Sequence, residues 1–156
     1  MKRSAAFLFQ CAICLFGFSV LVFLLWEPHV EGRNVHATVF EIYFKDPFLA
    51  YVYLGSVPFF LALFGLFRMF GNVRQNNGFS GGSLDALRRI KKCEVVFLFF
   101  VAGGAVFIIL FGDKEDRPPG LFLSILVVFF SSCFLMGLSK LRKYVEHVLA
   151  KCTNRH

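Results

Sequence analysis

Four long apolar runs organise the chain, and polar segments separate them. The runs cover residues 5–26, 48–67, 95–112 and 121–138, and none of them contains Asp, Glu, Lys, Arg or His. An α-helix rises about 1.5 Å per residue, so each run approaches or exceeds the length needed to cross the roughly 30 Å of hydrocarbon in a bilayer. Lipid cannot satisfy backbone polar groups, so each crossing segment must be helical. The pattern predicts an all-α fold: one integral membrane bundle of four transmembrane helices, forming a single domain over residues 1–156.

The composition excludes an ordinary soluble domain. Of the 156 residues, 57% are hydrophobic and 17% are charged, whereas soluble domains carry about 25% charged residues. Phe alone occupies 23 positions, and a globule of this size has too little interior to bury so much apolar surface. The first run follows Lys2 and Arg3 as a signal peptide would, but it is long and no small-residue cleavage site follows Trp26. We therefore expect the first run to remain as a membrane span.

The basic residues are distributed unevenly along the chain. The formal net charge is +7, and 13 of the 17 Lys and Arg residues lie before residue 5, within 68–94 or after residue 138. The positive-inside rule places these three segments, and with them both termini, in the cytoplasm. An excess of positive charge is also typical of nucleic-acid-binding proteins, but the chain has no recognisable reader fold and no platform of interleaved aromatic residues. We therefore expect no direct contact with nucleic acid.

Residues 68–94 form the most basic of the connections. Gly and Asn residues predict a loop over its first part, and Ser83 is the expected N-cap of a helix that runs into the third span. Leu84, Leu87 and Ile90 recur at helical spacing, which predicts a basic amphipathic helix at the membrane surface. Its basic side chains are Arg88, Arg89, Lys91 and Lys92. These four residues are the candidates for binding anionic lipid or a cytoplasmic protein partner.

Two further segments have a predicted role in the bundle. The connection at 113–120 contains two prolines and a glycine, which predict a turn between antiparallel third and fourth spans. The segment at 139–150 is predicted to continue the fourth span as a cytoplasmic helix. Its apolar stripe consists of Leu141, Tyr144, Val145 and Val148. We expect this stripe to pack against residues 84–93.

Few residues suggest catalysis. Cys11 and Cys14 form a C-x-x-C motif of the kind used in membrane thiol redox chemistry, but apolar residues surround it and the outer connections contain no cysteine. We expect these cysteines to be packing residues with free thiols. Potential metal ligands cluster after the first span: Glu27, His29, Glu31 and His36. Their spacing matches no compact ligand pattern, and the chain shows no nucleophile–base pair. We predict no catalytic, cofactor-binding or metal-binding residues.

The apolar runs contain small and hydroxyl-bearing residues: Ser19, Gly55, Ser56, Gly103, Gly104, Ser131, Ser132, Cys133 and Gly137. Such residues let membrane helices approach closely and hydrogen-bond across their interface, which is the role we expect. A substrate path is the alternative. It would make the protein a small transporter or channel subunit acting as an oligomer, with Ser131 and Ser132 as the first residues to test.

Four short motifs indicate a family. They are Asp46-Pro-Phe-Leu-Ala-Tyr51, Pro58-Phe-Phe60, Gly78-Phe-Ser80 and Leu87-Arg-Arg-Ile90. In order and spacing the chain resembles the bacterial four-helix integral membrane proteins grouped as domain of unknown function 2975. The resemblance implies a bacterial cytoplasmic (inner) membrane protein, often paired with a small helix-turn-helix regulator, and supplies no catalytic residues. Gly82-Ser83 stands where many members have Glu-Asn, and the ending Lys151-Cys-Thr-Asn-Arg-His156 differs from the acidic stretch and hydrophobic tail of many members.

Together these features favour a non-catalytic, multi-pass membrane module that binds or regulates a cytoplasmic partner. The expected partners are membrane lipid, a cytoplasmic regulator protein and further copies of the same chain. No cofactor is expected.

Overall fold

The computed structural model describes residues 3–30, 47–75, 79–112 and 117–153. Within these residues it has four α-helices: α1 (Arg3–Val30), α3 (Pro47–Gln75), α4 (Gly81–Phe111) and α5 (Arg117–Thr153). Each helix includes one of the four apolar runs, and all four are long and apolar enough to cross a membrane. The predicted all-α fold with four membrane-crossing helices is therefore confirmed.

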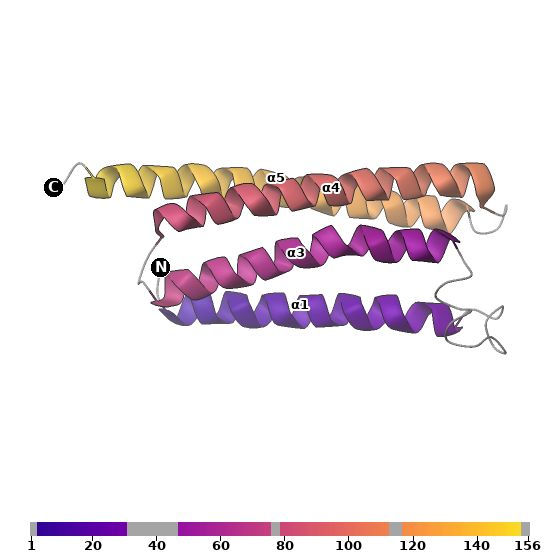
Figure 1. Ribbon diagram of the computed structural model, residues 1–156, viewed down its shortest axis with the longest axis horizontal. Coiled ribbons are helices and arrows are strands. Elements are labelled where there is room, and N and C mark those ends of the chain that lie inside the picture. The colour runs from indigo at the N-terminus through magenta and orange to yellow at the C-terminus, as the bar shows by residue number, and fades with distance from the viewer. Residues whose placement is uncertain (1–2, 31–46, 76–78, 113–116, 154–156) are drawn as a thin grey trace.

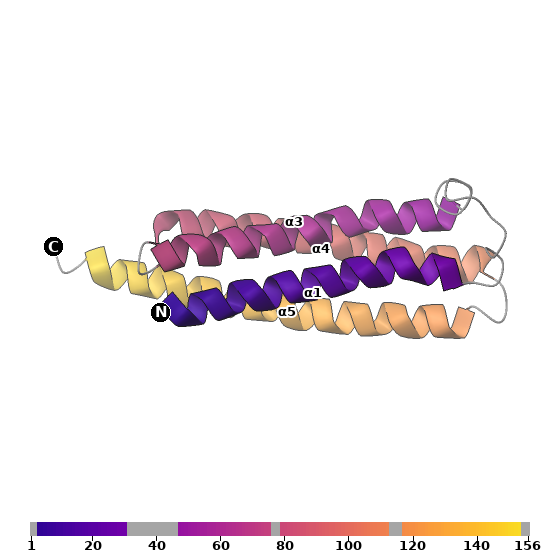
Figure 2. The ribbon, with the colours of Figure 1, turned by 90° about the horizontal axis from the view of Figure 1, so that it is seen from below.

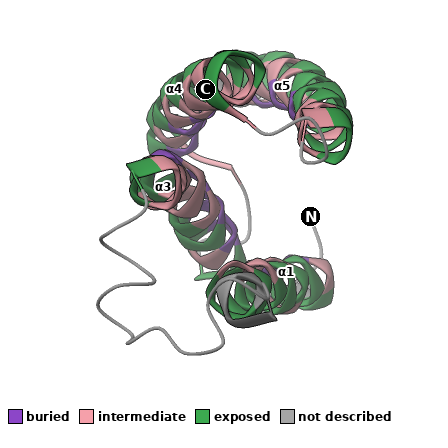
Figure 3. Cartoon of the chain, turned by 90° about the vertical axis from the view of Figure 1, so that its right-hand side faces the viewer, coloured by how far each residue is buried: buried purple, intermediate pink, exposed green. Residues whose placement is uncertain are grey.

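The helices run antiparallel, and both chain ends lie at the same end of the bundle (Figure 1). We name this end, where α1 and α4 start and α3 and α5 finish, the basic end, and the opposite end the far end. Extensive contacts join α1 to α3, α3 to α4, and α4 to α5. Seen along the bundle, the helices follow one another in this order as an open arc, with α1 and α5 at its two ends (Figure 3).

The surface of the bundle is apolar on every helix. Phe18, Phe99 and Phe130 are each about two thirds exposed or more, and Leu, Ile and Val side chains surround them on the outer faces. Such a surface would be unstable in water but matches the hydrocarbon of a bilayer, where exposed apolar side chains carry no cost. The fold therefore presents its hydrophobic residues to lipid, as the composition predicts.

The best-buried side chains gather toward the basic end, between α3, α4 and α5. The cluster consists of Ala62, Leu66, Met69, Phe70, Leu87, Ile90, Leu138 and Val145. Val145 is completely buried, and Leu141 and Leu149 pack on the same cluster. The expected packing of residues 139–150 on the start of α4 is thus confirmed. Tyr144 departs from the predicted stripe: it is 59% exposed, and only its ring edge meets the ring of Phe79.

The start of α4 differs from the prediction. The helix begins at Gly81, and Ser80 rather than Ser83 is its N-cap. The backbone N–H of Ser83 donates to the carbonyl of Ser80 at 2.9 Å, while the backbone N–H of Ser80 donates to the Ser83 hydroxyl at 3.2 Å. Ser83 is therefore buried inside the first turn, where it closes a reciprocal capping arrangement.

Glycines set the closest approaches between helices. A Cβ atom on Gly55 would lie 3.0 Å from Phe100, and one on Gly65 would lie 2.9 Å from Ile90. Gly103 likewise faces the Tyr51 hydroxyl, which donates to the Phe100 carbonyl at 2.9 Å. The expected packing role is confirmed for Gly55 and Gly103.

Other small residues in the runs do not hold helices together. A Cβ atom on Gly137 would meet nothing within 4 Å. Ser19 and Ser56 bond to carbonyl groups of their own helices, and Ser132 and Cys133 are exposed. The packing prediction was wrong for Gly137, Ser19, Ser132 and Cys133, which are exposed, because the small size of a residue does not reveal which face of its helix meets a neighbour.

These contacts predict different outcomes when Gly55 and Gly137 are each replaced by Leu. Gly55→Leu would press against Phe100 and is expected to lower the free energy of unfolding by about 1–3 kcal/mol. Gly137→Leu adds the same side chain in open space, so the stability should change little. The stability of both variants is measured by heating each protein in detergent and monitoring the loss of its monodisperse peak. Equal destabilisation would contradict the α3–α4 contact at Gly55.

Candidate functional sites: a basic end and a buried carboxyl group

The four basic residues singled out in the sequence share the outer face of α4. Arg88, Arg89, Lys91 and Lys92 are all exposed. The opposite face of the same turns carries Leu87 and Ile90, which are buried in the cluster described above. Arg88 forms an ion pair with Asp85 at 3.8 Å, and both side chains are mostly exposed. Such a pair contributes little to stability, so the face remains available for contacts outside the chain.

Helix α5 adds further basic residues at the same end. It runs unbroken from Arg117 to Thr153 and projects past the start of α4 (Figures 1 and 2). Its last turns carry Lys140, Arg142, Lys143 and Lys151. Arg142 donates to Glu146 at 2.8 Å, again at the surface. The start of α4 and the end of α5 therefore both carry a net positive charge at the basic end. We call these two segments, residues 81–92 and 140–151, the platform.

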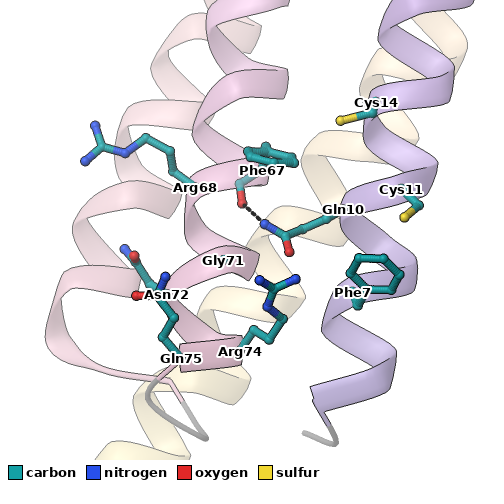
Figure 4. Close-up of a pocket in the computed structure, with 10 residues that line it drawn as sticks. All are labelled: Phe7, Gln10, Cys11, Cys14, Phe67, Arg68, Gly71, Asn72, Arg74 and Gln75. Carbon is teal, nitrogen blue, oxygen red and sulfur yellow. Dashed lines mark hydrogen bonds between the residues drawn. The ribbon is translucent and has the colours of Figure 1, made fainter.

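An open cavity of about 450 Å³ lies between α1 and α3 toward the basic end (Figure 4). Helix α1 supplies apolar, amide and thiol groups, and α3 supplies polar and basic ones. The lining residues are Phe7, Gln10, Cys11, Cys14, Phe67, Arg68, Gly71, Asn72, Arg74 and Gln75. Arg74 lies over the ring of Phe7, with its guanidinium carbon 5.7 Å from the ring centre. This contact joins the two helices at the mouth of the cavity.

Gln10 is the buried polar residue of this cavity. It is 8% exposed and donates from Nε2 to the Phe67 carbonyl at 3.2 Å. Gly71 makes room for the amide, because a Cβ atom there would lie 3.0 Å from Nε2. An interhelical hydrogen bond of this kind fixes the register of two membrane helices. Gln10 is the one strongly polar residue of the 5–26 run, but the sequence does not show which helix it faces.

The C-x-x-C motif lies on the α1 wall of the same cavity. Cys11 and Cys14 are free thiols, and the Cys14 side chain points toward α3 (Figure 4). The sequence suggested purely apolar surroundings, but α3 brings Arg68 and Arg74 to the cavity. The potential ligands Glu31 and His36 lie outside the described residues, as do the side chains of Glu27 and His29. Within the described chain, no three His, Cys, Asp or Glu residues are close enough to bind a metal together.

Glu94 is the residue that sequence reasoning missed. It lies in α4 and is 4% exposed, and its carboxyl group lies beside Ser131 of α5. The apolar run was defined as beginning at Val95, so Glu94 was counted with the basic segment. Helical spacing contained the signal: Leu87, Ile90 and Glu94 stand at positions i, i+3 and i+7, on one face. That face is the one that packs into the bundle.

The contacts between α3 and α4 show how deep Glu94 lies within the membrane-crossing region. They run from Phe48 opposite Phe107 through Gly55 opposite Phe100 to Gly65 opposite Ile90. Glu94, four residues beyond Ile90, therefore lies level with residue 61 of α3. At about 1.5 Å per residue this is about 5 Å from the midpoint of the 48–67 run, whereas the 95–112 run of α4 itself puts Glu94 about 14 Å from its midpoint, so Glu94 lies in the half of the membrane-crossing region nearer the basic end. Its partner Ser131 lies close to the middle of its own apolar run, 121–138.

Four apolar helices with lipid-facing surfaces and a basic end define a multi-pass helical membrane protein. Within this class, the chain belongs to the family described as Protein of unknown function (DUF2975), which matches residues 34–151. The chain is 25% identical over 150 residues to YoaS, an uncharacterized membrane protein of Bacillus subtilis (strain 168), covering 96% of this chain and 94% of the relative. No solved structure matches the chain. The resemblance noted from the four motifs is thereby confirmed.

The α1–α3 hydrogen bond predicts a measurable effect of Gln10. Gln10→Leu keeps the size of the side chain but removes the donor to Phe67, and we expect it to lower the free energy of unfolding by about 1 kcal/mol. Gln75→Leu changes an exposed amide on the rim of the same cavity and serves as the control. Reversible unfolding of the purified protein in mixed micelles checks both. A Gln10→Leu protein as stable as the control would contradict the role of this bond.

Proposed function

We propose that the protein is a non-catalytic module of the bacterial cytoplasmic membrane, and that its platform binds an acidic surface of a cytoplasmic protein. One observation carries this proposal: α5 continues beyond the other helices and packs on the start of α4, so that basic side chains stand on a rigid support. A rigid surface loses less conformational entropy when a partner binds than a flexible tail does. Its positive charge would also speed the encounter with an acidic partner.

The proposed orientation follows from the distribution of charge. Most Lys and Arg residues of the chain belong to the segments at the basic end, and such segments remain on the cytoplasmic side during insertion. The antiparallel arrangement of the four helices puts the start of α1, the end of α3, the start of α4 and the end of α5 on one side. With this orientation the platform faces the cytoplasm.

Anionic lipid is the second proposed contact of the basic end. Lys91 and Lys92 lie less than one turn from Glu94, so their long side chains extend from within the membrane toward the headgroups. Each basic side chain near an anionic surface contributes about 1 kcal/mol of attraction. All four basic residues belong to the platform, and we expect Lys91 and Lys92, nearer Glu94, to contact lipid headgroups as well.

A transport function receives less support from the same geometry. The buried polar side chains inside the membrane-crossing region of the described chain are Gln10, Glu94 and Ser131. Gln10 belongs to the α1–α3 interface, whereas Glu94 belongs to the α4–α5 interface. They do not form one continuous polar path, so we keep the transporter as the alternative and the binding module as the proposal.

The orientation is tested with reporter fusions. Green fluorescent protein joined after His156 is expected to fluoresce, and alkaline phosphatase at the same point is expected to be inactive, because its disulfides form only outside the cytoplasm. Fusions after residue 115, at the far end, should give the opposite pair of results. A fluorescent fusion at residue 115 together with an active phosphatase at the C-terminus would reverse the assignment.

Partner binding is tested by charge reversal on α4. We expect charge reversal to abolish recovery of the partner after crosslinking in native membranes and affinity capture. The variant has Glu in place of Arg88, Arg89, Lys91 and Lys92. The physical reason is that an acidic surface would then face four negative charges in place of four positive ones. Mass spectrometry of the captured material provides the measurement.

Two controls separate binding from insertion, since the same charges help to set the topology. The C-terminal fluorescent fusion reports whether the variant still inserts in the same direction. The pair Arg142→Gln and Lys143→Gln leaves α4 intact and changes only the part of α5 beside the start of α4, so it should weaken capture without affecting insertion. Unchanged capture by a correctly inserted charge-reversal variant would refute the platform. Recovery of the protein alone would instead indicate an oligomer of this chain.

A further inference from the structure

Glu94 is the one ionisable side chain among the buried residues that the structure describes. It lies about 5 Å from the middle of the α3 span and belongs to the interface of α4 with α5. An ionisable group in this position is costly, and in membrane proteins it marks a functional site by default. The binding of a partner at the platform makes no use of it.

No opposite charge compensates Glu94 within the described chain. Residues 48–67 of α3 and 118–139 of α5 contain no Asp, Glu, Lys, Arg or His. The nearest cations on α4 itself, Lys91 and Lys92, are exposed. A carboxylate without a counter-ion in apolar surroundings is unfavourable, and such a group becomes neutral by taking up a proton.

The other titratable groups of the neighbouring helices have different surroundings. On α3, the hydroxyl groups of Tyr51 and Tyr53 donate to the carbonyls of Phe100 and Leu24, away from the level of Glu94. On α5, Cys133 is exposed, and Cys93 on α4 is half-buried. Ser131, which is 7% exposed, is the polar side chain of α5 that lies beside the carboxyl group.

Ser131 suits both states of a carboxyl group that gains and loses a proton. Its hydroxyl donates to a carboxylate, and after rotation it accepts from a protonated carboxyl group. A purely structural hydrogen bond at this place would need only an amide or a second hydroxyl group. We propose that Glu94 and Ser131 form a proton-binding site inside the membrane, between α4 and α5.

The site is tested on the purified full-length chain with dicyclohexylcarbodiimide. This apolar reagent enters the membrane region and adds the O–H of a protonated carboxyl group across one of its C=N bonds, with the proton passing to nitrogen. Intact mass and peptide mapping are expected to show one adduct, at Glu94. Because the reaction needs the protonated form, labelling should fall by roughly tenfold or more between about pH 6 and about pH 9.

Matched variants locate the reaction. Glu94→Gln keeps the shape of the side chain and should abolish the adduct, while Glu146→Gln, at an exposed and paired carboxylate, should leave it unchanged. Ser131→Ala removes the donor to the carboxylate and should move the midpoint of labelling to higher pH. Ser132→Ala, on the exposed side of α5, should not move it. A merely structural serine would alter stability without shifting this midpoint.

Three results would overturn the proposal. They are an unlabelled Glu94 in the folded wild-type protein, labelling independent of pH, and protection by sodium ions at constant pH. The last result would assign the site to a monovalent cation instead of a proton. The experiment needs no partner protein, so its failure and the failure of partner binding are distinguishable.

Discussion

Every peptide group that enters the hydrocarbon must find its hydrogen-bond partner within the protein, and the rest of this structure depends on that constraint. It makes each apolar run a helix before any tertiary contact exists. The lipid also removes the hydrophobic effect as a force between the helices, since lipid is as apolar as Leu or Phe. Association must then come from close packing and from a few hydrogen bonds. The glycines at positions 55 and 65, and the bonds made by Gln10, Tyr51 and Tyr53, are among those contacts.

The bundle is organised around its basic end. Leu87 and Val145 are buried there, although both belong to helical segments rich in Lys and Arg. This part of the core lies where α4 and α5 leave the membrane, so water replaces lipid as the surrounding medium and apolar burial again contributes to stability. The same cluster that ends the membrane bundle therefore also supports the platform. Movement of α5 relative to α4 at the level of Glu94 would be transmitted along two continuous helices.

The sequence was sufficient for the features that depend on one helix at a time. Unbroken apolar runs predicted four spans, and the stripe around Val145 predicted packing on α4, because both follow from composition and from a period of 3.6 residues. It was insufficient wherever two helices meet. Which carbonyl Gln10 reaches, and whether Gly55 or Gly137 faces a neighbour, depends on the register and rotation of helices far apart in the chain. Glu94 was missed because the charge-free run was treated as the boundary of the span, although the buried stripe continues across it.

The open arc of helices has a consequence for synthesis. Each helix makes its extensive contacts with the helix that precedes or follows it along the chain, and α1 and α5 are not extensively packed on one another. During synthesis each interface can therefore form as soon as the next helix enters the bilayer. No early helix has to wait for a partner that is synthesised much later. Local pairing of this kind shortens the time during which half-made polar interfaces face lipid. The Glu94 carboxyl group follows the same rule, since Ser131 arrives with the next helix, α5.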